Sequence, residues 1–291
     1  MKVGAARQGV RGQYTVCMIL STPSPLLAPG GSLLLVGVAV ALYVLAAFPL
    51  GAMKRLSAAA LLGAFALHAL LLLIDIGGFG QALPGARLGF GPVLSITVWL
   101  VIGVYTVESR LVPLPTERQW LGLAGVGAVM VAALFPGDPK VMHSPLAPLH
   151  FALGVGSYGL FGAAVFHGLL LDAAERRLRN RLPSGSGAPA TGMPLMLLER
   201  LTFRFVEAGF SVLTATLLLG ILTTVQWRWT DHKAVFSLLA WGVFAALLVG
   251  RRSRGWRGRQ ATRWLYAGAL LLLLAYVGSR FVLEVLLGRT V

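Results

Sequence analysis

Residues 57–74 read SAAALLGAFALHALLLLI, an apolar run that is interrupted only by the imidazole of His68. As an α-helix this run is about 27 Å long, close to the ~30 Å thickness of bilayer hydrocarbon. Comparable stretches recur along the chain and predict eight helices, at approximately Ser32–Met53, Ser57–Ile74, Phe90–Val107, Trp120–Phe135, Pro148–Leu171, Phe203–Val225, Ala234–Val249 and Trp264–Leu283. The sequence therefore predicts an all-α, polytopic membrane protein with about eight transmembrane helices, folded as one domain over residues 32–291.

The composition indicates that lipid is part of the solvent of this protein. Of 291 residues, 57% are hydrophobic and only 12% are charged, whereas a soluble domain carries about a quarter charged residues. The net charge of +15 is also compatible with nucleic-acid binding. However, Lys and Arg lie between the apolar runs, as they do in cytoplasmic loops. We therefore expect membrane lipid, and no nucleic acid, as a partner.

Two segments have the composition of unstructured chain. Residues 1–31 contain three basic residues, a short apolar run and the sequence STPSP. They lack the long apolar region and small-residue cleavage site of a signal peptide. We predict a disordered tail, or an extension upstream of a start near Met18. The Gly-, Ser- and Pro-rich residues 183–194 predict a linker. The single cysteine, Cys17, excludes an internal disulfide framework.

The distribution of basic residues predicts the orientation of the helices. Cytoplasmic loops of membrane proteins carry an excess of Lys and Arg. Here the basic residues concentrate after the first, third, fifth and seventh predicted helices: Lys54, Arg55, Arg110, Arg118, Arg176, Arg177, Arg179, Arg181, Arg200, Arg204, Arg251, Arg252, Arg254, Arg257, Arg259 and Arg263. These loops are therefore expected in the cytoplasm and both termini outside it, in a multi-pass protein of the cytoplasmic (inner) membrane.

Three of the five histidines are predicted toward the outer side: His68, His150 and His232. Neutral imidazoles near one membrane face are able to ligate a haem iron or another metal. Alternatively, each is a single polar group that bonds to a neighbouring helix. His167 lies about 25 Å from His150 along one helix, too far to share a metal, and is expected at the interface beside Asp172 and Glu175.

The predicted outer loop at residues 226–233 reads QWRWTDHK. Tryptophans are common at membrane interfaces. Here Trp227 and Trp229 are followed, after Thr230, by an acidic residue, an imidazole and a cation. A macrocycle with carboxylate groups needs aromatic walls for its ring and Arg or Lys for its carboxylates.

The same segment carries a family resemblance. Residues 227–233 (WRWTDHK), 238–244 (LLAWGVF) and 254–258 (RGWRG) resemble the tryptophan-rich signature of the cytochrome c assembly protein family (CcsA/CcmC/ResC-like). The resemblance covers about Ser144–Leu287 and is closest to the YpjD-like inner-membrane branch. Members of the family hold haem at the outer membrane face, where it is attached to apocytochrome c.

The resemblance implies haem b as cofactor, and apocytochrome c and a ResB-like subunit as partners. It makes His150 an axial ligand, and the sequence offers His68 or His232 as the second. The other implied haem contacts are Trp227, Trp229 and Asp231 for the ring, with Lys233 or Arg228 near the propionates. The chain departs from the family pattern at Ala234, where Glu is usual, at Val249, where a histidine is usual, and near Leu287, where the second external histidine is absent.

No hydrolytic triad or phosphate-binding loop is visible in the sequence, so we predict a binding protein and not an enzyme. A small-solute or ion transporter is one alternative, because His68 and Asp75 share a helix face and Glu207 lies within another predicted helix. No inverted repeat supports this alternative. A non-haem scaffold subunit of a membrane complex is a second alternative, favoured by the absent family histidines.

Overall fold

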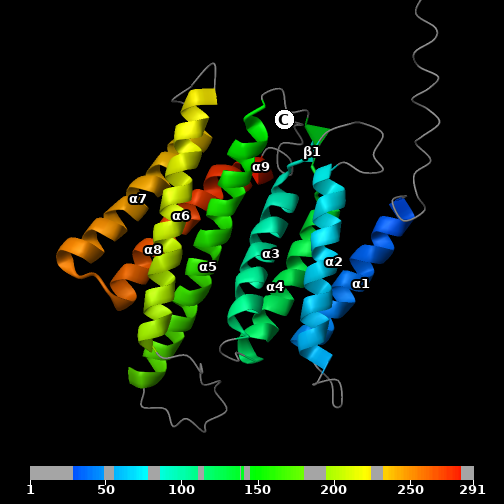
Figure 1. The fold of residues 1–291 in the computed structure, drawn as a ribbon, viewed down its shortest axis with the longest axis horizontal. Helices are drawn as coiled ribbons and strands as arrows, with labels where there is room; N and C mark the ends of the chain where they lie inside the picture. The colour runs from blue at the N-terminus through cyan, green and yellow to red at the C-terminus, as the bar shows by residue number, and fades with distance from the viewer. Residues whose placement is uncertain are drawn as a thin grey trace, which may run out of the picture.

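The computed structural model describes residues 29–48, 56–77, 86–110, 115–137, 139–140, 145–179, 195–223 and 232–282. These residues form long helices that run roughly side by side (Figure 1). The helices are α1 (Pro29–Ala47), α2 (Ser57–Gly77), α3 (Phe90–Glu108), α4 (Pro115–Leu134), α5 (Ala147–Arg179), α6 (Leu195–Thr223), α7 (His232–Arg254), α8 (Gly258–Leu273) and the short α9 (Ser279–Phe281). A π-helical turn, Leu274–Gly278, joins α8 to α9. Strands β1 (Ala86–Arg87) and β2 (Pro139–Lys140) pair antiparallel.

The predicted all-α, polytopic membrane fold is confirmed. Six helical segments are long and apolar enough to cross a membrane, by length and composition: α2, α3, α5, α6, α7 and the continuous segment Gly258–Phe281. Leu33–Ala47 of α1 is a shorter apolar helix. The last residues of the predicted N-terminal tail are helical, since α1 already begins at Pro29. Proline is well tolerated at the first position of a helix. Residues 1–28 lie outside the described residues.

Helices α5 and α6 are longer than the apolar runs predicted. α5 continues past Leu171 to Arg179, and α6 begins at Leu195 instead of Phe203. Hydropathy marks only the part of a helix that lies in hydrocarbon, whereas the backbone stays helical wherever helix-forming residues follow. In α5 the carboxylate of Glu175 lies 3.5 Å from the guanidinium of Arg179, one turn later.

Among the described residues the bundle has two large hydrophobic cores and two smaller apolar clusters. One lies mainly among α1–α4 and includes the buried side chains of Tyr43 and Tyr105. The other lies among α5–α8, where Phe161 and Phe244 stack with their ring centroids 3.8 Å apart. α3 packs on α5, and α5 also packs on α8. α5 is therefore the helix on which the two halves meet.

The α3–α5 contact is close because α5 has glycine there. A Cβ atom built on Gly159 would lie 2.5 Å from Cδ1 of Leu100, and one on Gly162 would lie 2.9 Å from Cγ2 of Val101. Real Cβ atoms do not approach other atoms this closely, so only glycine permits the observed helix spacing. We call the α3–α5 contact, together with the adjoining contact between α5 and α8, the seam.

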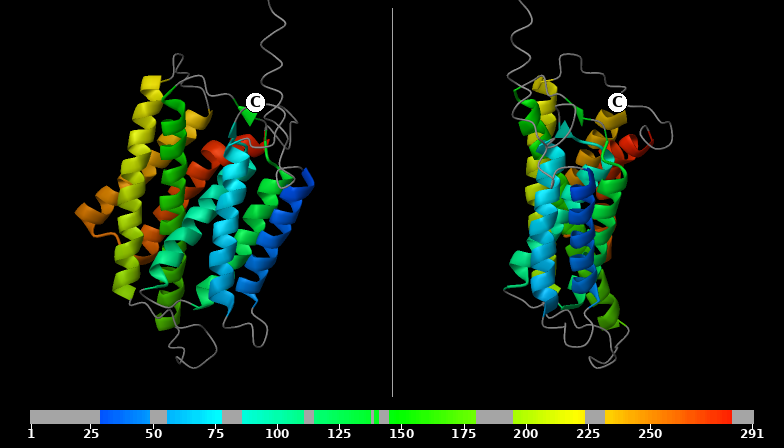
Figure 2. Two further views of the ribbon diagram at one scale, coloured as in Figure 1. Left: turned by 45° about the vertical axis from the view of Figure 1, so that its right-hand side comes forward. Right: turned by 90° about the vertical axis from the view of Figure 1, so that its right-hand side faces the viewer.

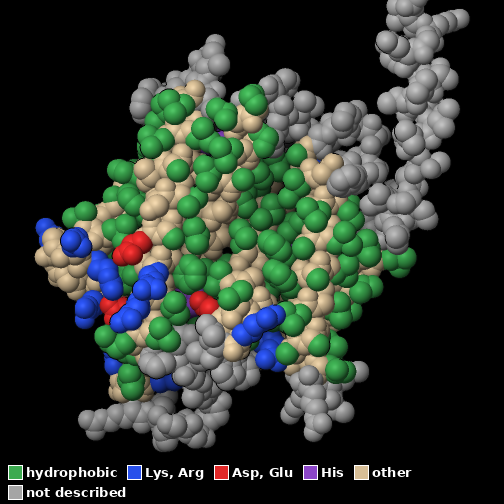
Figure 3. Space-filling view, in the orientation of Figure 1, with side chains coloured by type: hydrophobic (Ala, Val, Ile, Leu, Met, Phe, Trp, Pro, Cys, Tyr) green, Lys and Arg blue, Asp and Glu red, His purple; other side chains and the backbone are tan. Residues whose placement is uncertain are grey.

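The two ends of the bundle differ in charge. The last turns of α5 and α7 carry basic residues, and Figure 3 shows Lys and Arg side chains in the lower half of one face, with mainly hydrophobic side chains above them. α1 begins and α9 ends at the opposite end (Figure 1). We call the first end the basic end. Its tight α7–α8 turn uses Gly255 and Gly258, whose φ angles of 65° and 54° favour glycine.

Candidate functional site

His150 lies in the first turn of α5, at the end of the bundle opposite the basic end (Figure 1). Its imidazole lies close to the backbone of Thr216 on α6 and interacts with it electrostatically. Its Nδ1 atom is buried and has no hydrogen-bond partner among the described residues. The ring lies against Gly220, where a Cβ would come within 3.0 Å of Cε1. His150 therefore offers a buried ring nitrogen that is available to a ligand.

A cavity of about 100 Å³ adjoins His150. Its walls come from α3, α5 and the π-helical turn: Val93, Phe151, Gly154, Val155, Tyr158 and Tyr276. The hydroxyl of Tyr158 donates to the carbonyl of Leu272, and the hydroxyl of Tyr276 donates to the carbonyl of Leu88 at 2.6 Å. Both tyrosine hydroxyls are thus engaged by the backbone. The rings form aromatic walls, and His150 supplies the available nitrogen.

His68 has different surroundings. It is 1% exposed, with Nδ1 2.9 Å from the Tyr43 hydroxyl and Nε2 2.7 Å from the Ser95 hydroxyl. These bonds connect α1, α2 and α3 inside the first core. The small cavity beside His68 is lined by Asp75 and Ser95 and does not include His150. The structure therefore does not bring these two histidines together, and His68 shows the hydrogen-bonded arrangement that was the alternative to ligation.

His232 is the first residue of α7 and is exposed, and Lys233 follows it in the helix. The N-terminal ends of α5 and α7 lie at the same end of the bundle in both views of Figure 2. His150 and His232 are therefore at one end of the molecule. The remaining predicted contacts lie outside the described residues: Trp227, Arg228, Trp229 and Asp231.

Of the groups that suggested transport, His68 and Asp75 line one small cavity, and Glu207 lies apart from them. Glu207 is exposed on α6, whereas His68 is enclosed among α1–α3. Asp75 interacts electrostatically with Arg87 of β1. Among the residues that the structure describes, no group of three or more His, Cys, Asp or Glu side chains is placed to hold a metal ion.

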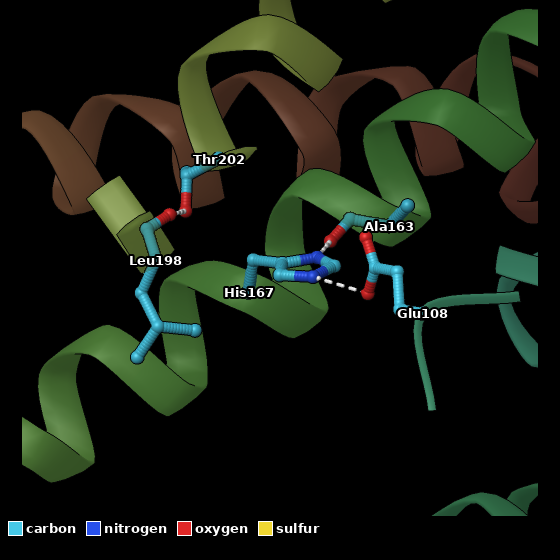
Figure 4. A network of polar contacts seen from close by, with 5 residues as sticks. All are labelled: Glu108, Ala163, His167, Leu198 and Thr202. Atoms are coloured by element: carbon cyan, nitrogen blue, oxygen red, sulfur yellow. Dashed lines mark hydrogen bonds and ion pairs between the residues drawn. The ribbon is translucent and has the colours of Figure 1, made fainter. Parts of the chain in front are cut away.

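The structure also reveals a polar pair that the sequence did not predict (Figure 4). His167 is fully buried, and its Nε2 lies 2.8 Å from Oε2 of Glu108, the last residue of α3. Its Nδ1 lies 2.8 Å from the carbonyl of Ala163, and the ring of Phe205 stacks on it. The expected interfacial position beside Asp172 and Glu175 is wrong, because the helix turns His167 toward α3. Glu108 is 59 positions away in the sequence, so no local pattern indicated the pair.

Both ring nitrogens of His167 face oxygen atoms that ordinarily accept hydrogen bonds. The Glu108–His167 pair joins the two halves of the bundle toward the basic end.

The family model described as "Cytochrome C assembly protein" matches residues 30–287. The chain is 30% identical over 249 residues to the inner membrane protein YpjD of Escherichia coli (strain K12), covering 81% of this chain and 89% of that protein. It is 34% identical over 222 residues to the cytochrome c biogenesis protein CcsA of Synechococcus sp. (strain CC9311), covering 64% and 72% respectively. No solved structure matches it.

Proposed function

Because the chain belongs to the cytochrome c assembly protein family, we propose that it binds haem b at the outer face of the cytoplasmic (inner) membrane during cytochrome c biogenesis. The observation that carries the proposal is the buried Nδ1 atom of His150, which has no hydrogen-bond partner among the described residues. A buried polar atom in a native protein is normally bonded. An imidazole nitrogen beside aromatic walls suits an axial ligand of haem.

The cavity at His150 limits how haem fits. Its volume of about 100 Å³ is below the roughly 300–1,000 Å³ of pockets that enclose whole ligands. We therefore propose that only one edge of the porphyrin enters the cavity. Trp227, Trp229 and Asp231 in the loop between α6 and α7 are the proposed cover for the remaining ring surface. Haem would supply the iron, while the chain orients the ring and limits access of water to it.

His232 is the preferred candidate for the second axial ligand. Both nitrogens of His68 are already hydrogen-bonded inside the first core, and no displacement of Tyr43 or Ser95 is needed if His232 ligates instead. His232 is exposed at the end of the bundle where His150 lies. Lys233 and Arg228 flank it in the sequence, where they would pair with the haem propionates.

The proposed orientation places the basic end in the cytoplasm, following the positive-inside rule. The starts of α5 and α7, and both chain termini, then lie outside the cytoplasm. We propose apocytochrome c as the acceptor of the haem and a ResB-like subunit as a partner in the membrane. In this assignment the chain acts by binding and presenting haem, and not as an enzyme by itself.

Visible spectroscopy of the purified protein tests the proposal. After haem-replete expression and purification in detergent, the wild type should show a haem Soret band. His150→Gly should lose it, and added imidazole should restore it, because imidazole replaces the missing ligand but not a missing packing contact. Leu149→Ala, at a neighbouring side chain that is 50% exposed, is the matched control and should keep the band. A wild-type protein without bound haem would overturn the proposal and favour the scaffold alternative.

A further inference from the structure

A second cavity, of about 280 Å³, lies along the seam between α3, α5 and α8. Thr97 of α3, Tyr158 and Val165 of α5, and Ala269, Leu270 and Leu273 of the α8 segment contribute to its wall. His150 does not line it, and Tyr158 is the one residue that lines both this cavity and the haem-site cavity among the described residues. The seam cavity is therefore distinct from the proposed haem site.

The lining of the seam cavity offers no polar group to a ligand. The hydroxyl of Thr97 donates to the carbonyl of Val93 at 2.8 Å, and that of Tyr158 donates to the carbonyl of Leu272. The third hydroxyl, on Tyr266, donates to the carboxylate of Asp172 at 3.0 Å. A molecule in this cavity therefore meets methyl groups, methylenes and ring carbons, and must itself be apolar.

The cavity opens toward the membrane. Leu270 and Leu273 are 58% and 39% exposed, and they lie inside the segment Gly258–Phe281 that is long and apolar enough to span it. At this depth the surrounding medium is hydrocarbon. The apolar group that this medium supplies is the acyl chain of a phospholipid.

Two arginines continue the cavity surface toward the basic end. In α8, positions 263, 266, 270 and 273 share a helix face, so Arg263 lies about 10 Å along the axis from Leu270. In α5, positions 158, 165, 172 and 176 share a face, and Arg176 interacts electrostatically with Tyr266. Both arginines are exposed, and neither forms an ion pair within the described part of the chain. Two carboxylates lie nearby on α5: Asp172 is held by the hydroxyls of Thr262 and Tyr266, and Glu175 lies 3.5 Å from Arg179.

We propose that the seam binds one anionic phospholipid of the cytoplasmic leaflet. One acyl chain fills the cavity, and the phosphate lies between Arg176 and Arg263. The separation of the two arginines from the apolar wall matches that between a headgroup and the upper part of its acyl chain. The cytoplasmic leaflet carries anionic lipids, and the positive-inside orientation places the basic end there. The lipid would stabilise the contact between the two halves of the bundle.

Native mass spectrometry of delipidated protein, titrated with dioleoyl phosphatidylglycerol, tests the acyl-chain part. Ala269→Phe puts a phenyl ring into the cavity, and Ala267→Phe makes the same change at an exposed position of α8 that does not line it. The wild type and Ala267→Phe should retain one phosphatidylglycerol per chain at low lipid concentration, and Ala269→Phe should not. Equal retention by all three proteins would overturn the proposal.

The headgroup part is tested with charge variants that leave the cavity intact. The double variant Arg176→Ser/Arg263→Ser should bind phosphatidylglycerol about thirtyfold more weakly, since each basic residue near a headgroup contributes roughly a fivefold change in affinity. Arg252→Ser/Arg254→Ser removes the same charge from α7 and should have little effect. Dioleoyl phosphatidylcholine should bind the wild type about as weakly as phosphatidylglycerol binds the double variant. Equal weakening by both double variants, or equal affinity for the two lipids, would overturn the proposal even if Ala269→Phe failed to fold.

Discussion

His68 and His150 are the same residue type, and the sequence offered both as haem ligands, but their ring nitrogens have different partners. Those of His68 face two hydroxyls within the first core, whereas Nδ1 of His150 has no hydrogen-bond partner among the described residues, and His150 lines a cavity. Nothing within either helix distinguishes them, because Tyr43 and Ser95 belong to other helices. The sequence could therefore predict which histidines are candidates. The choice among them depends on tertiary contacts that it does not contain.

His68→Ala should lower the thermal unfolding midpoint of the detergent-solubilised protein by several degrees. The substitution leaves the hydroxyls of Tyr43 and Ser95 buried without a partner, at a cost of about 1–3 kcal/mol for each such group. The haem spectrum of the folded fraction should not change. Ser95→Ala, which removes one of the two bonds, should have a smaller effect on the midpoint. Loss of the Soret band in a fully folded His68→Ala protein would instead identify His68 as a ligand.

The Glu108–His167 pair should show energetic coupling in a double-mutant cycle. Glu108→Gln retains the shape but removes the carboxylate charge, and His167→Ala removes the ring. Each should reduce the free energy of unfolding by about 1–3 kcal/mol. The double variant should lose clearly less than the sum, because either change alone already breaks the pair. Additive losses, measured by denaturation in the same detergent, would show that the two side chains are near one another without interacting.

The sequence predicted well which segments are helical and in what order they follow one another. It predicted the ends of the helices poorly. The apolar runs predicted α2 and α3 to within three residues, because both helices lie almost wholly in apolar sequence. The extensions of α5 and α6 were missed because charged residues interrupt both of them. The sequence also did not indicate which helices pack against one another. The glycines of α5 could be seen, but not that Gly159 meets Leu100 on α3.

Gly159→Ala should destabilise the α3–α5 contact by about 1–3 kcal/mol, the usual cost of overpacking a tight interface. Gly156→Ala in the same helix is the matched control, because the nearest side chain would be 4.0 Å from its new Cβ. The control should be neutral or slightly stabilising, since alanine favours helix over glycine. The thermal unfolding midpoints of the two variants give the comparison. Adding Leu100→Ala to Gly159→Ala should recover part of the loss if the clash is its cause.

Taken as a whole, the bundle has an apolar body and a cationic end, and this asymmetry predicts its orientation. The 33 residues of α5 span about 50 Å, more than the hydrocarbon thickness, so its ends lie on opposite sides of the membrane. In a Cys17→Ser background, Leu146→Cys and Leu178→Cys place thiols at these ends, at positions that are 45% and 68% exposed. A membrane-impermeant maleimide should label intact spheroplasts only at position 146. Labelling only at position 178 would reverse the proposed orientation.

The position of the Tyr158 ring affects which molecules can reach His150 from the seam cavity. The ring is a partition between two compartments: one holds the proposed haem ligand, and the other is open to the hydrocarbon of the bilayer. Its hydroxyl donates a hydrogen bond to the carbonyl of Leu272 in the α8 segment, and this bond restricts rotation of the side chain. If Tyr158→Ala removed it, the two compartments would become one passage along which a lipid tail reaches the imidazole of His150. One aromatic ring thus lies between the apolar interior of the membrane and the proposed haem ligand.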